Sequence, residues 1–165
     1  MKNAKSKAEI QVAMGEVAVA MAPHTISSVG LGSCVAVALY DTQRRIGGLA
    51  HVMLPGSASI NGSQTSCGYA DPAITALLKA LRIKGGVRKD IVAKMVGGAR
   101  MFSNYGDSSK GIGGQCIESI KDILKREQIP VIGEDTGGHH GRNIEFYLDT
   151  GRVVVSAIGK EDKEI

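Results

Sequence analysis

Alternation of apolar and polar positions predicts strands at the beginning of the chain. Residues 9–22 (EIQVAMGEVAVAMA) alternate in places between apolar and polar side chains, as half-buried strands do, and Gly15 is expected at a bulge or bend between them. Residues 25–29 are expected to add a short strand. Residues 1–8 are predicted to be disordered, and residues 9–165 to form a single domain.

Two segments have the sequence signals of helices. Asp71 directly precedes Pro72, which puts an N-cap residue before a proline at the first helical position and predicts a helix over residues 72–82. A second helix is predicted over residues 115–127, where apolar side chains recur at i, i+3, i+4 and i+7 and basic ones lie outside this stripe. The stripe consists of Cys116, Ile117, Ile120, Ile123 and Leu124. Such a helix is expected to pack on a sheet.

Apolar, β-branched runs predict further strands, several of them joined as hairpins. Residues 35–40 and 46–54 predict one hairpin, and residues 143–149 and 152–158 predict another. Residues 90–96 (DIVAKMV) predict a buried strand. Since strands outnumber helices and several form hairpins, an α+β fold with a sheet core is favoured over alternating βαβ units.

Composition and charge narrow the class of protein. A chain of 165 residues that is 43% apolar can bury a sizeable core without disulfides or metals. The net charge of +4 comes from dispersed basic residues, which argues against nucleic-acid binding. Cys34, Cys67 and Cys116 are an odd number without a C-x-x-C pair, which disfavours both a disulfide framework and a structural zinc site. This cysteine usage fits a reducing cytoplasm, and because no apolar run is long enough to span a bilayer, we expect no membrane insertion.

The candidate nucleophile is Cys34, which follows Gly30-Leu-Gly-Ser where a loop of small residues enters a strand. If residues 41–44 form the hairpin loop, antiparallel pairing sets Cys34 directly opposite His51. Directly opposed side chains share one face, with Cβ atoms roughly 4.5–5.5 Å apart. Contact with the imidazole would lower the pKa of the thiol toward neutrality. The spacing therefore predicts a Cys-His dyad.

Backbone groups around the thiol are candidates for an oxyanion hole. The amide N–H groups of Gly32, Ser33 and Cys34 could point at one position, because glycine permits conformations that other residues avoid. A structural interpretation stands beside the catalytic one. A lone cysteine beside a strand is usually a small buried apolar residue, and a lone histidine in an apolar strand is usually a structural residue.

Five short segments of the sequence resemble those of a known protein family, which is information that residue spacing alone does not provide. They are GLGSCVAV (30–37), AHVMLP (50–55), YAD (69–71), GGARMF (97–102) and GEDTGG (133–138), in this order. Together they resemble the CheD family of chemoreceptor glutamine deamidases, over roughly residues 10–158. The five segments in sequence are far more specific than any one of them.

The resemblance implies a fold, a reaction and partners. The fold would consist of packed mixed or antiparallel β-sheets flanked by helices, similar to that of the cytotoxic necrotizing factor-type cysteine deamidases. Cys34 falls on the family's nucleophile and His51 on its base, for hydrolysis of a glutamine side chain to glutamate and ammonia without metal or organic cofactor. The substrates would be methyl-accepting chemotaxis receptors, and a CheC-type phosphatase would bind and lower the activity. The same acyl chemistry also permits hydrolysis of receptor glutamyl methyl esters.

The third catalytic position departs from the family pattern. Six residues before the cysteine the family has threonine, and this chain has Ser28. Serine keeps the hydroxyl that could orient the imidazole, but its χ1 is less restricted. Ser28 is thus the third catalytic candidate. Its presence is also the one feature that favours an alternative function, a non-catalytic regulator that binds the phosphatase or the receptor.

Other polar residues give weaker signals. Residues 133–142, a predicted glycine-rich loop after a strand at Val131-Ile132, could line the substrate groove or orient His51, or simply form a capped turn between strands. His139 and His140 do not predict a metal site, since adjacent histidines on an extended chain point apart and spacing indicates no third ligand. Cys116 is most simply a core residue, and Cys67 is a loop thiol without an assigned role.

Overall fold

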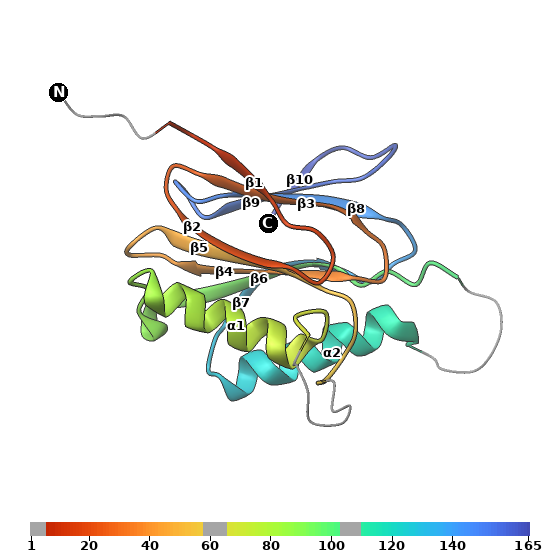
Figure 1. The fold of residues 1–165 in the computed structure, drawn as a ribbon. Helices are drawn as coiled ribbons and strands as arrows, with labels where there is room; N and C mark the ends of the chain where they lie inside the picture. Colours follow the sequence, from red (N-terminus) through yellow and green to blue (C-terminus); the bar gives the residue numbers. More distant parts are fainter. Residues whose placement is uncertain (1–5, 58–65, 103–109) are drawn as a thin grey trace.

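The computed structural model describes residues 6–57, 66–102 and 110–165. In these residues the chain forms two five-stranded sheets, packed face to face, with two α-helices on the far side of one sheet (Figure 1). We call the sheet between the helices and the other sheet the central sheet. Its strands, in spatial order, are β2 (Val17–Met21), β5 (Ile46–Val52), β4 (Val35–Asp41), β6 (Ile91–Gly97) and β7 (Val131–Thr136). The outer sheet consists of β1 (Glu9–Gln11), β3 (Thr25–Leu31), β8 (Arg142–Tyr147), β9 (Arg152–Ser156) and β10 (Lys163–Glu164).

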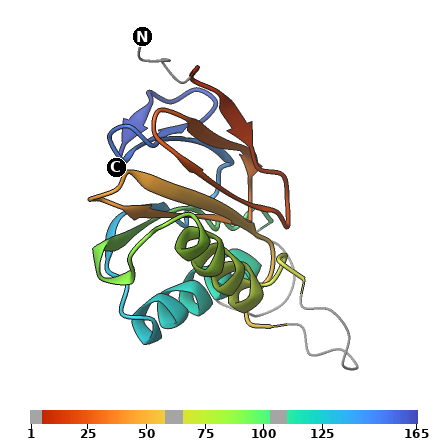
Figure 2. The same ribbon diagram turned by 60° about the vertical axis from the view of Figure 1, so that its left-hand side comes forward.

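The predicted α+β class is confirmed, and both sheets are mixed. Most neighbouring strands are antiparallel, but β1 pairs with β3 in parallel and so does β6 with β7. The β6–β7 pair is joined through a helix, so one βαβ unit occurs among the hairpins. Figure 2 shows the three layers that result, with the outer sheet above, the central sheet in the middle and the helices below.

The central strands are buried at each position because both of their faces are covered. Along β4, Val35, Val37 and Leu39 pack against the helices. The alternate residues Ala36 and Ala38 pack against the outer sheet. The apolar run that predicted this strand is therefore divided between two separate hydrophobic clusters.

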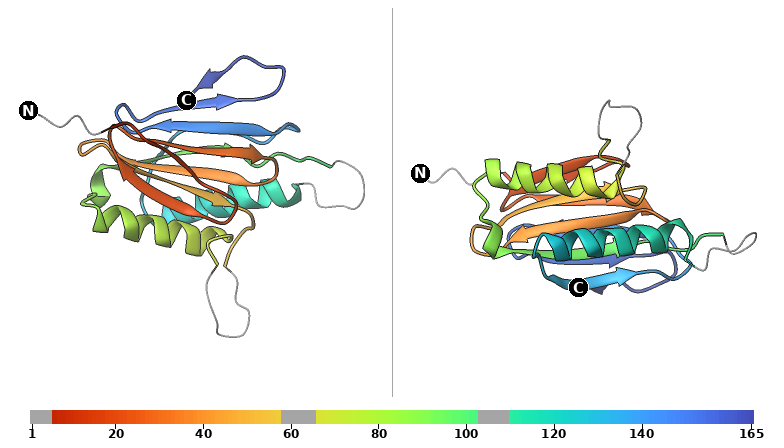
Figure 3. Two further views of the ribbon diagram at one scale, coloured as in Figure 1. Left: turned by 45° about the horizontal axis from the view of Figure 1, so that its top comes forward. Right: turned by 90° about the horizontal axis from the view of Figure 1, so that it is seen from below.

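The two helices lie side by side across the central sheet (Figure 3). They are α1 (Ala70–Ile83) and α2 (Gly111–Arg126), and a short 3₁₀ turn, η1 (Arg88–Asp90), precedes β6. The predicted stripe of α2 is confirmed, with Ile117 partly buried and its other four members buried. The predicted N-cap of α1 is wrong, because the helix begins at Ala70 and its N-cap, Tyr69, has no side-chain cap. Backbone carbonyls of the preceding segment accept the first amides instead, and Asp71 pairs with Arg126 across the helices at 2.8 Å.

Most predicted strands are present, with changes at their ends. The 9–22 segment is divided into β1 and β2 around Gly15, which has a φ of 75°. The second predicted hairpin is β8–β9. Residues 133–136, predicted as part of a loop, instead continue β7 alongside β6. Of the N-terminal segment predicted to be disordered, residues 1–5 lie outside the described residues, and residues 6–8 have no regular secondary structure.

Candidate active site

The three predicted catalytic residues come from three chain segments that meet between the sheets. Ser28 lies on β3 of the outer sheet, His51 lies on β5 of the central sheet, and Cys34 directly precedes β4. Ser28 and His51 are 0% and 1% exposed, respectively. Cys34 is partly exposed and packs against the cluster between the sheets. The packing of the two sheets therefore adds Ser28 to Cys34 and His51, which the β4–β5 hairpin already brings to one face.

The predicted register of the β4–β5 hairpin is wrong by two residues. Ala36 pairs with His51, and Asp41 pairs with Ile46, so the turn comprises residues 42–45. Because side chains alternate with a period of two, a shift of two residues leaves Cys34 and His51 on the same face. Cys34 and His51 are diagonal neighbours across the hairpin, and the Cα atoms of such a pair are typically about 7–8 Å apart.

The turn chemistry explains this register. The Asp41 carboxylate accepts the backbone N–H groups of Gln43 and Arg44 at 3.0 and 2.9 Å, which closes a turn directly after β4. Arg45 then takes a φ of 53°, a conformation that is uncommon outside glycine. The strand pairing therefore extends through Asp41, one residue beyond the predicted end of the strand.

A buried hydrogen-bond chain fixes the imidazole of His51. The Ser28 hydroxyl donates to the carbonyl oxygen of Val12 at 2.7 Å, and Ser28 Oγ itself lies 2.8 Å from His51 Nδ1. A serine hydroxyl has one proton, so Ser28 Oγ must accept from Nδ1–H. The neutral ring is therefore protonated on Nδ1, and Nε2 keeps its lone pair.

The other ring nitrogen is free to act as a base. His51 Nε2 is buried and has no hydrogen-bond partner among the described residues. No hydrogen bond joins it to Cys34 Sγ in the part of the chain that the structure describes. Catalytic hydrogen bonds are often long before substrate binds, and a base without a described partner, on the same face as a thiol, suits proton transfer.

Burial keeps both members of this pair neutral. It raises the pKa of the Cys34 thiol, and the residue's own backbone N–H opposes the shift only in part. Burial likewise lowers the pKa of His51, against the opposing effect of the Val12 carbonyl. The sequence-based expectation of a thiol pKa near neutrality is therefore wrong, because burial raises the pKa of Cys34 and only its own backbone N–H opposes this shift. The resting pair consists of a thiol and a neutral imidazole.

The loop before Cys34 is held by the end of β6. The amides of Gly98 and Ala99 donate to the carbonyl oxygens of Cys34 and Gly32 at 2.8 and 2.9 Å. Gly97 has a φ of 111°, and a Cβ at this position would lie 2.3 Å from the Cys34 carbonyl oxygen. Only glycine fits there. The GGARMF segment thus determines where the thiol stands.

The candidate amides for an oxyanion hole differ in availability. The amide of Gly32 donates to the Gly30 carbonyl at 3.1 Å. Among the described residues, the amides of Ser33 and Cys34 donate to no backbone carbonyl. The backbone N–H of Cys34 lowers the pKa of the thiol, against the larger opposite effect of burial. Of the three candidate amides, those of Ser33 and Cys34 are therefore the ones without a described backbone acceptor.

Residues 133–142 border the site without touching its base. The amide of Gly137 donates to Gly97 and the amide of Arg100 donates to Gly138, at 2.9 and 2.8 Å. The stretch thus supports the segment that holds the cysteine loop, whereas Ser28 orients His51. His139 Nδ1 lies 3.0 Å from the Arg100 carbonyl. In the described ranges no group of three or more metal-ligating side chains occurs.

The remaining cysteines have different surroundings. Cys116 is buried in the core beneath the helices, as predicted, and burial raises the pKa of its thiol to about 11. Cys67 is partly exposed in the segment before α1 and packs against the same core.

Sequence reasoning missed the Val12 carbonyl, which accepts the Ser28 hydroxyl, because a backbone acceptor leaves no signal in residue types.

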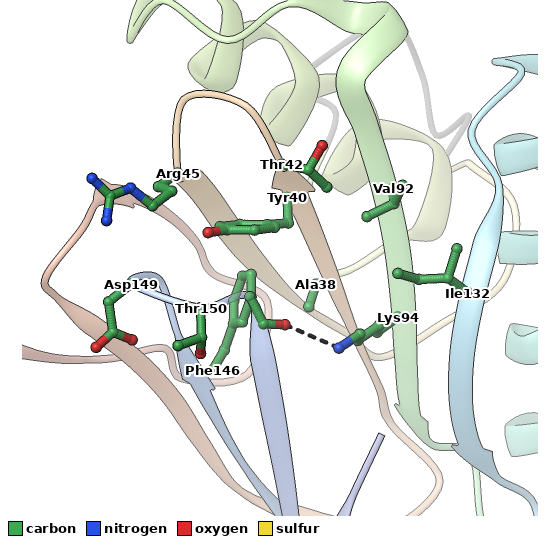
Figure 4. A pocket seen from close by; sticks show the side chains of 11 residues that line it. Ala38, Tyr40, Thr42, Arg45, Val92, Lys94, Ile132, Phe146, Asp149 and Thr150 are labelled. Carbon is green, nitrogen blue, oxygen red and sulfur yellow. Dashed lines mark hydrogen bonds between the residues drawn. The ribbon is translucent and has the colours of Figure 1, made fainter.

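A cavity of about 260 Å³ opens at the opposite end of the interface between the sheets (Figure 4). Tyr40 and Phe146 line it as an edge-to-face pair 5.7 Å apart, and Lys94 donates at its side to the Gly151 carbonyl at 3.0 Å. Tyr40 lies six positions along β4 from Cys34, roughly 20 Å in an extended strand. This cavity is therefore separate from the cysteine site.

Sequence comparisons with known proteins show which family the chain belongs to. A sequence model of the family described as "CheD chemotactic sensory transduction" matches residues 53–157. A protein of Halalkalibacterium halodurans named "Chemoreceptor glutamine deamidase CheD" is 40% identical over 158 residues, which cover 94% of this chain and 98% of that protein. The chain belongs to the CheD family.

Two other relatives cover similar shares. Proteins named "Probable chemoreceptor glutamine deamidase CheD" from Clostridium novyi and Archaeoglobus fulgidus are 40% and 44% identical. The matches cover 93% and 89% of this chain and 96% and 92% of those proteins. The resemblance noted from five short segments is thus confirmed for nearly the whole chain. In the described part of the chain, none of the helices combines the length and the apolar character that crossing a membrane requires.

Proposed function

We propose that this CheD protein hydrolyses glutamine side chains of chemoreceptors to glutamate and ammonia, with Cys34 as nucleophile and His51 as base. The observation that carries the proposal is the hydrogen-bond chain from His51 through Ser28 to Val12, which leaves a buried Nε2 without a partner among the described residues, on the face that Cys34 shares. The names of the relatives support the receptor glutamine as substrate.

The first half of the reaction forms a thioester. Cys34 Sγ attacks the carboxamide carbon while its proton passes to His51 Nε2. The carboxamide oxygen becomes an oxyanion, for which the amides of Ser33 and Cys34 are the available donors. The imidazolium then gives its proton to the leaving nitrogen, the C–N bond breaks, and ammonia departs.

The second half regenerates the enzyme. His51 Nε2 takes a proton from water, and the hydroxide attacks the thioester carbon. The C–S bond breaks, the sulfur recovers the proton, and the receptor keeps a glutamate. Because burial raises the pKa of Cys34 and lowers that of His51, proton transfer accompanies the attack and no thiolate is stored beforehand.

Ser28 acts as the third catalytic residue by orienting the base. It fixes the Nδ1–H tautomer and stabilises the imidazolium that forms when Nε2 accepts a proton. The hydroxyl is common to serine and threonine, so the change from the family's threonine keeps this interaction.

Further properties are inferred from the composition of the chain and from the family resemblance. We infer a cytoplasmic protein whose residues 9–165 form one domain, with a fold related to the cytotoxic necrotizing factor-type deamidases. A CheC-type phosphatase is its inferred binding partner, and hydrolysis of receptor glutamyl methyl esters is a compatible second activity. Each of these is a proposal separate from the catalytic one.

A non-catalytic regulator is the competing function. It is favoured by the burial that raises the pKa of Cys34 and by the lack of a described hydrogen bond between the thiol and His51. In that case the chain would bind receptor or phosphatase without converting glutamine. The two functions differ in whether glutamate appears.

The deciding experiment incubates a receptor cytoplasmic fragment with wild-type protein, with Cys34→Ala and with Cys67→Ala as the matched cysteine control. Peptide mass spectrometry then measures glutamine-to-glutamate conversion, a mass increase of about one unit. Conversion by wild type and Cys67→Ala, but not by Cys34→Ala, supports the deamidase. Binding of the fragment without conversion by any of the three supports the regulator.

A further inference from the structure

The segment from Val12 to Glu16, which joins β1 to β2, is hydrogen-bonded to both sheets. On the outer sheet, Val12 N–H donates to the Ser27 carbonyl at 2.8 Å, and the Val12 carbonyl accepts the Ser28 hydroxyl at 2.7 Å. On the central sheet, His51 N–H donates to the Glu16 carbonyl at 3.1 Å. The 12–16 segment therefore contacts both the backbone of the base and the hydroxyl that orients it.

The side chain of Glu16 closes this segment into a tight turn. Its Oε2 accepts the backbone N–H of Ala13 at 3.0 Å, and its own N–H donates to the Ala13 carbonyl at 3.1 Å. Gly15 supplies the φ of 75° that the turn requires, and its N–H donates to the His51 carbonyl at 3.0 Å. The carboxylate is exposed to solvent, and in the described part of the chain it forms no salt bridge.

The position of the Val12 carbonyl decides which tautomer His51 adopts. The single hydroxyl proton of Ser28 can go either to Val12 O or to His51 Nδ1. While it goes to Val12, the ring must supply the proton on Nδ1, and Nε2 stays free. If the carbonyl moves away, the hydroxyl can donate to Nδ1 instead. The ring proton then sits on Nε2, which can no longer accept the thiol proton.

We propose that Glu16 is a positioning residue for the base, acting through the turn that holds the Val12 carbonyl against Ser28. The expected effect on kcat rests on the proposed function, because it requires the protein to be a deamidase. The expected effect on the tautomer of His51 does not depend on catalysis. Loss of one hydrogen bond of ordinary strength in the turn corresponds to a fall in kcat of about threefold to tenfold. KM should stay nearly constant, since Glu16 touches neither the thiol nor the oxyanion donors.

The test compares Glu16→Ala and Glu16→Gln with Glu9→Ala as the matched control. Glutamine keeps a side-chain oxygen that can accept the Ala13 amide, so it should restore the wild-type behaviour. Glu9 is also an exposed acid of the N-terminal segment, and its Oε1 accepts the Ser27 hydroxyl at 2.9 Å. Because Ser27 does not contact the imidazole, Glu9→Ala reports the effect of losing a similar bond elsewhere.

Two readouts are measured on each full-length variant. The ¹⁵N chemical shifts of the His51 ring, assigned by their loss in His51→Gln, give the tautomer, and receptor deamidation gives kcat and KM. We expect Glu16→Ala alone to move the ring toward the Nε2–H form and to lower kcat at constant KM. Glu16→Gln and Glu9→Ala should match the wild type in both.

The outcomes separate this inference from the proposed function. If Glu16→Ala keeps the Nδ1–H tautomer of the wild type, the inference is overturned whatever the activity. An equal tautomer shift in Glu9→Ala also overturns it, because the effect would then be general to the N-terminal segment. If the wild type converts no glutamine while Glu16→Ala shifts the tautomer, the positioning role stands and the proposed function is wrong.

Discussion

Removal of the Ser28 hydroxyl should impair both the base and the stability of the fold. Ser28 is fully buried, and Ser28→Ala leaves both the His51 Nδ1–H and the Val12 carbonyl without their shared partner. An unsatisfied buried polar group costs about 1–3 kcal/mol. The free energy of unfolding should therefore fall by about 2 kcal/mol, a decrease in Tm of roughly 4–8 °C for a chain of this size.

The kinetic effect follows from the same hydrogen bond. Without the hydroxyl, Ser28 no longer fixes the tautomer of His51, and the imidazolium loses this hydrogen-bond partner. If this loss amounts to about 1.4–2.8 kcal/mol in the transition state, kcat falls about tenfold to a hundredfold. Ser28→Thr keeps the hydroxyl and restores the family residue, so it should stay within about threefold of the wild type.

The assay measures conversion of receptor glutamine by mass spectrometry at a temperature where all variants are folded. Ser27→Ala is the matched control, since this neighbouring buried serine bonds Glu9 and not the imidazole. Ser27→Ala should retain kcat. Wild-type activity in folded Ser28→Ala would refute the reasoning. So would an equal loss of activity in Ser28→Ala and Ser27→Ala.

Three further predictions concern ionisation and turn chemistry. Because burial raises the pKa of Cys34, its alkylation by iodoacetamide should be slow at neutral pH and should accelerate only above about pH 9. Mass spectrometry of digested peptides measures the labelling of Cys34. Fast labelling at pH 6 would contradict the prediction. Burial lowers the pKa of His51, so only the unfolded chain takes up its proton as the pH falls below about 6.5, and stability decreases there. In His51→Gln, the free energy of unfolding, measured by chemical denaturation, should decrease less steeply with falling pH across that range. A pH dependence equal to that of the wild type would count against a buried neutral ring. Asp41→Ala should lower the free energy of unfolding by about 3 kcal/mol, because three backbone N–H groups lose the buried carboxylate to which they donate. A loss below about 1 kcal/mol in urea denaturation would contradict this role of Asp41.

The sequence was sufficient for most of the secondary-structure elements but not for the register between them. Apolar runs predicted the β4–β5 hairpin within two residues at each end, since central strands buried on both faces are apolar throughout. The register depends on the Asp41 side chain and on Arg45 at a φ of 53°. An arginine in that conformation has no signature in an apolar–polar pattern. A shift of two residues left the face of His51 correct, whereas a shift of one would have reversed it.

The contact between the sheets was beyond the reach of local patterns. Ser28 and His51 are 23 residues apart on different sheets, and only the packing of one sheet on the other brings Oγ to Nδ1. Family resemblance singled out Ser28, whereas the Val12 carbonyl had no sequence signal at all. The direction of the thiol pKa shift could not be predicted either. It depends on burial in the interface between the sheets, which a sequence does not specify.

The central claim is that the sulfur of Cys34 becomes bonded to the substrate carbonyl carbon. Rapid acid quenching of the enzyme with excess receptor peptide, followed by intact-mass and fragment analysis, detects this thioester. The account predicts a transient adduct equal to protein plus peptide minus ammonia, located at Cys34, and its absence in Cys34→Ala. Glutamate formation that continues undiminished in Cys34→Ala, with no adduct on the wild type, would contradict it.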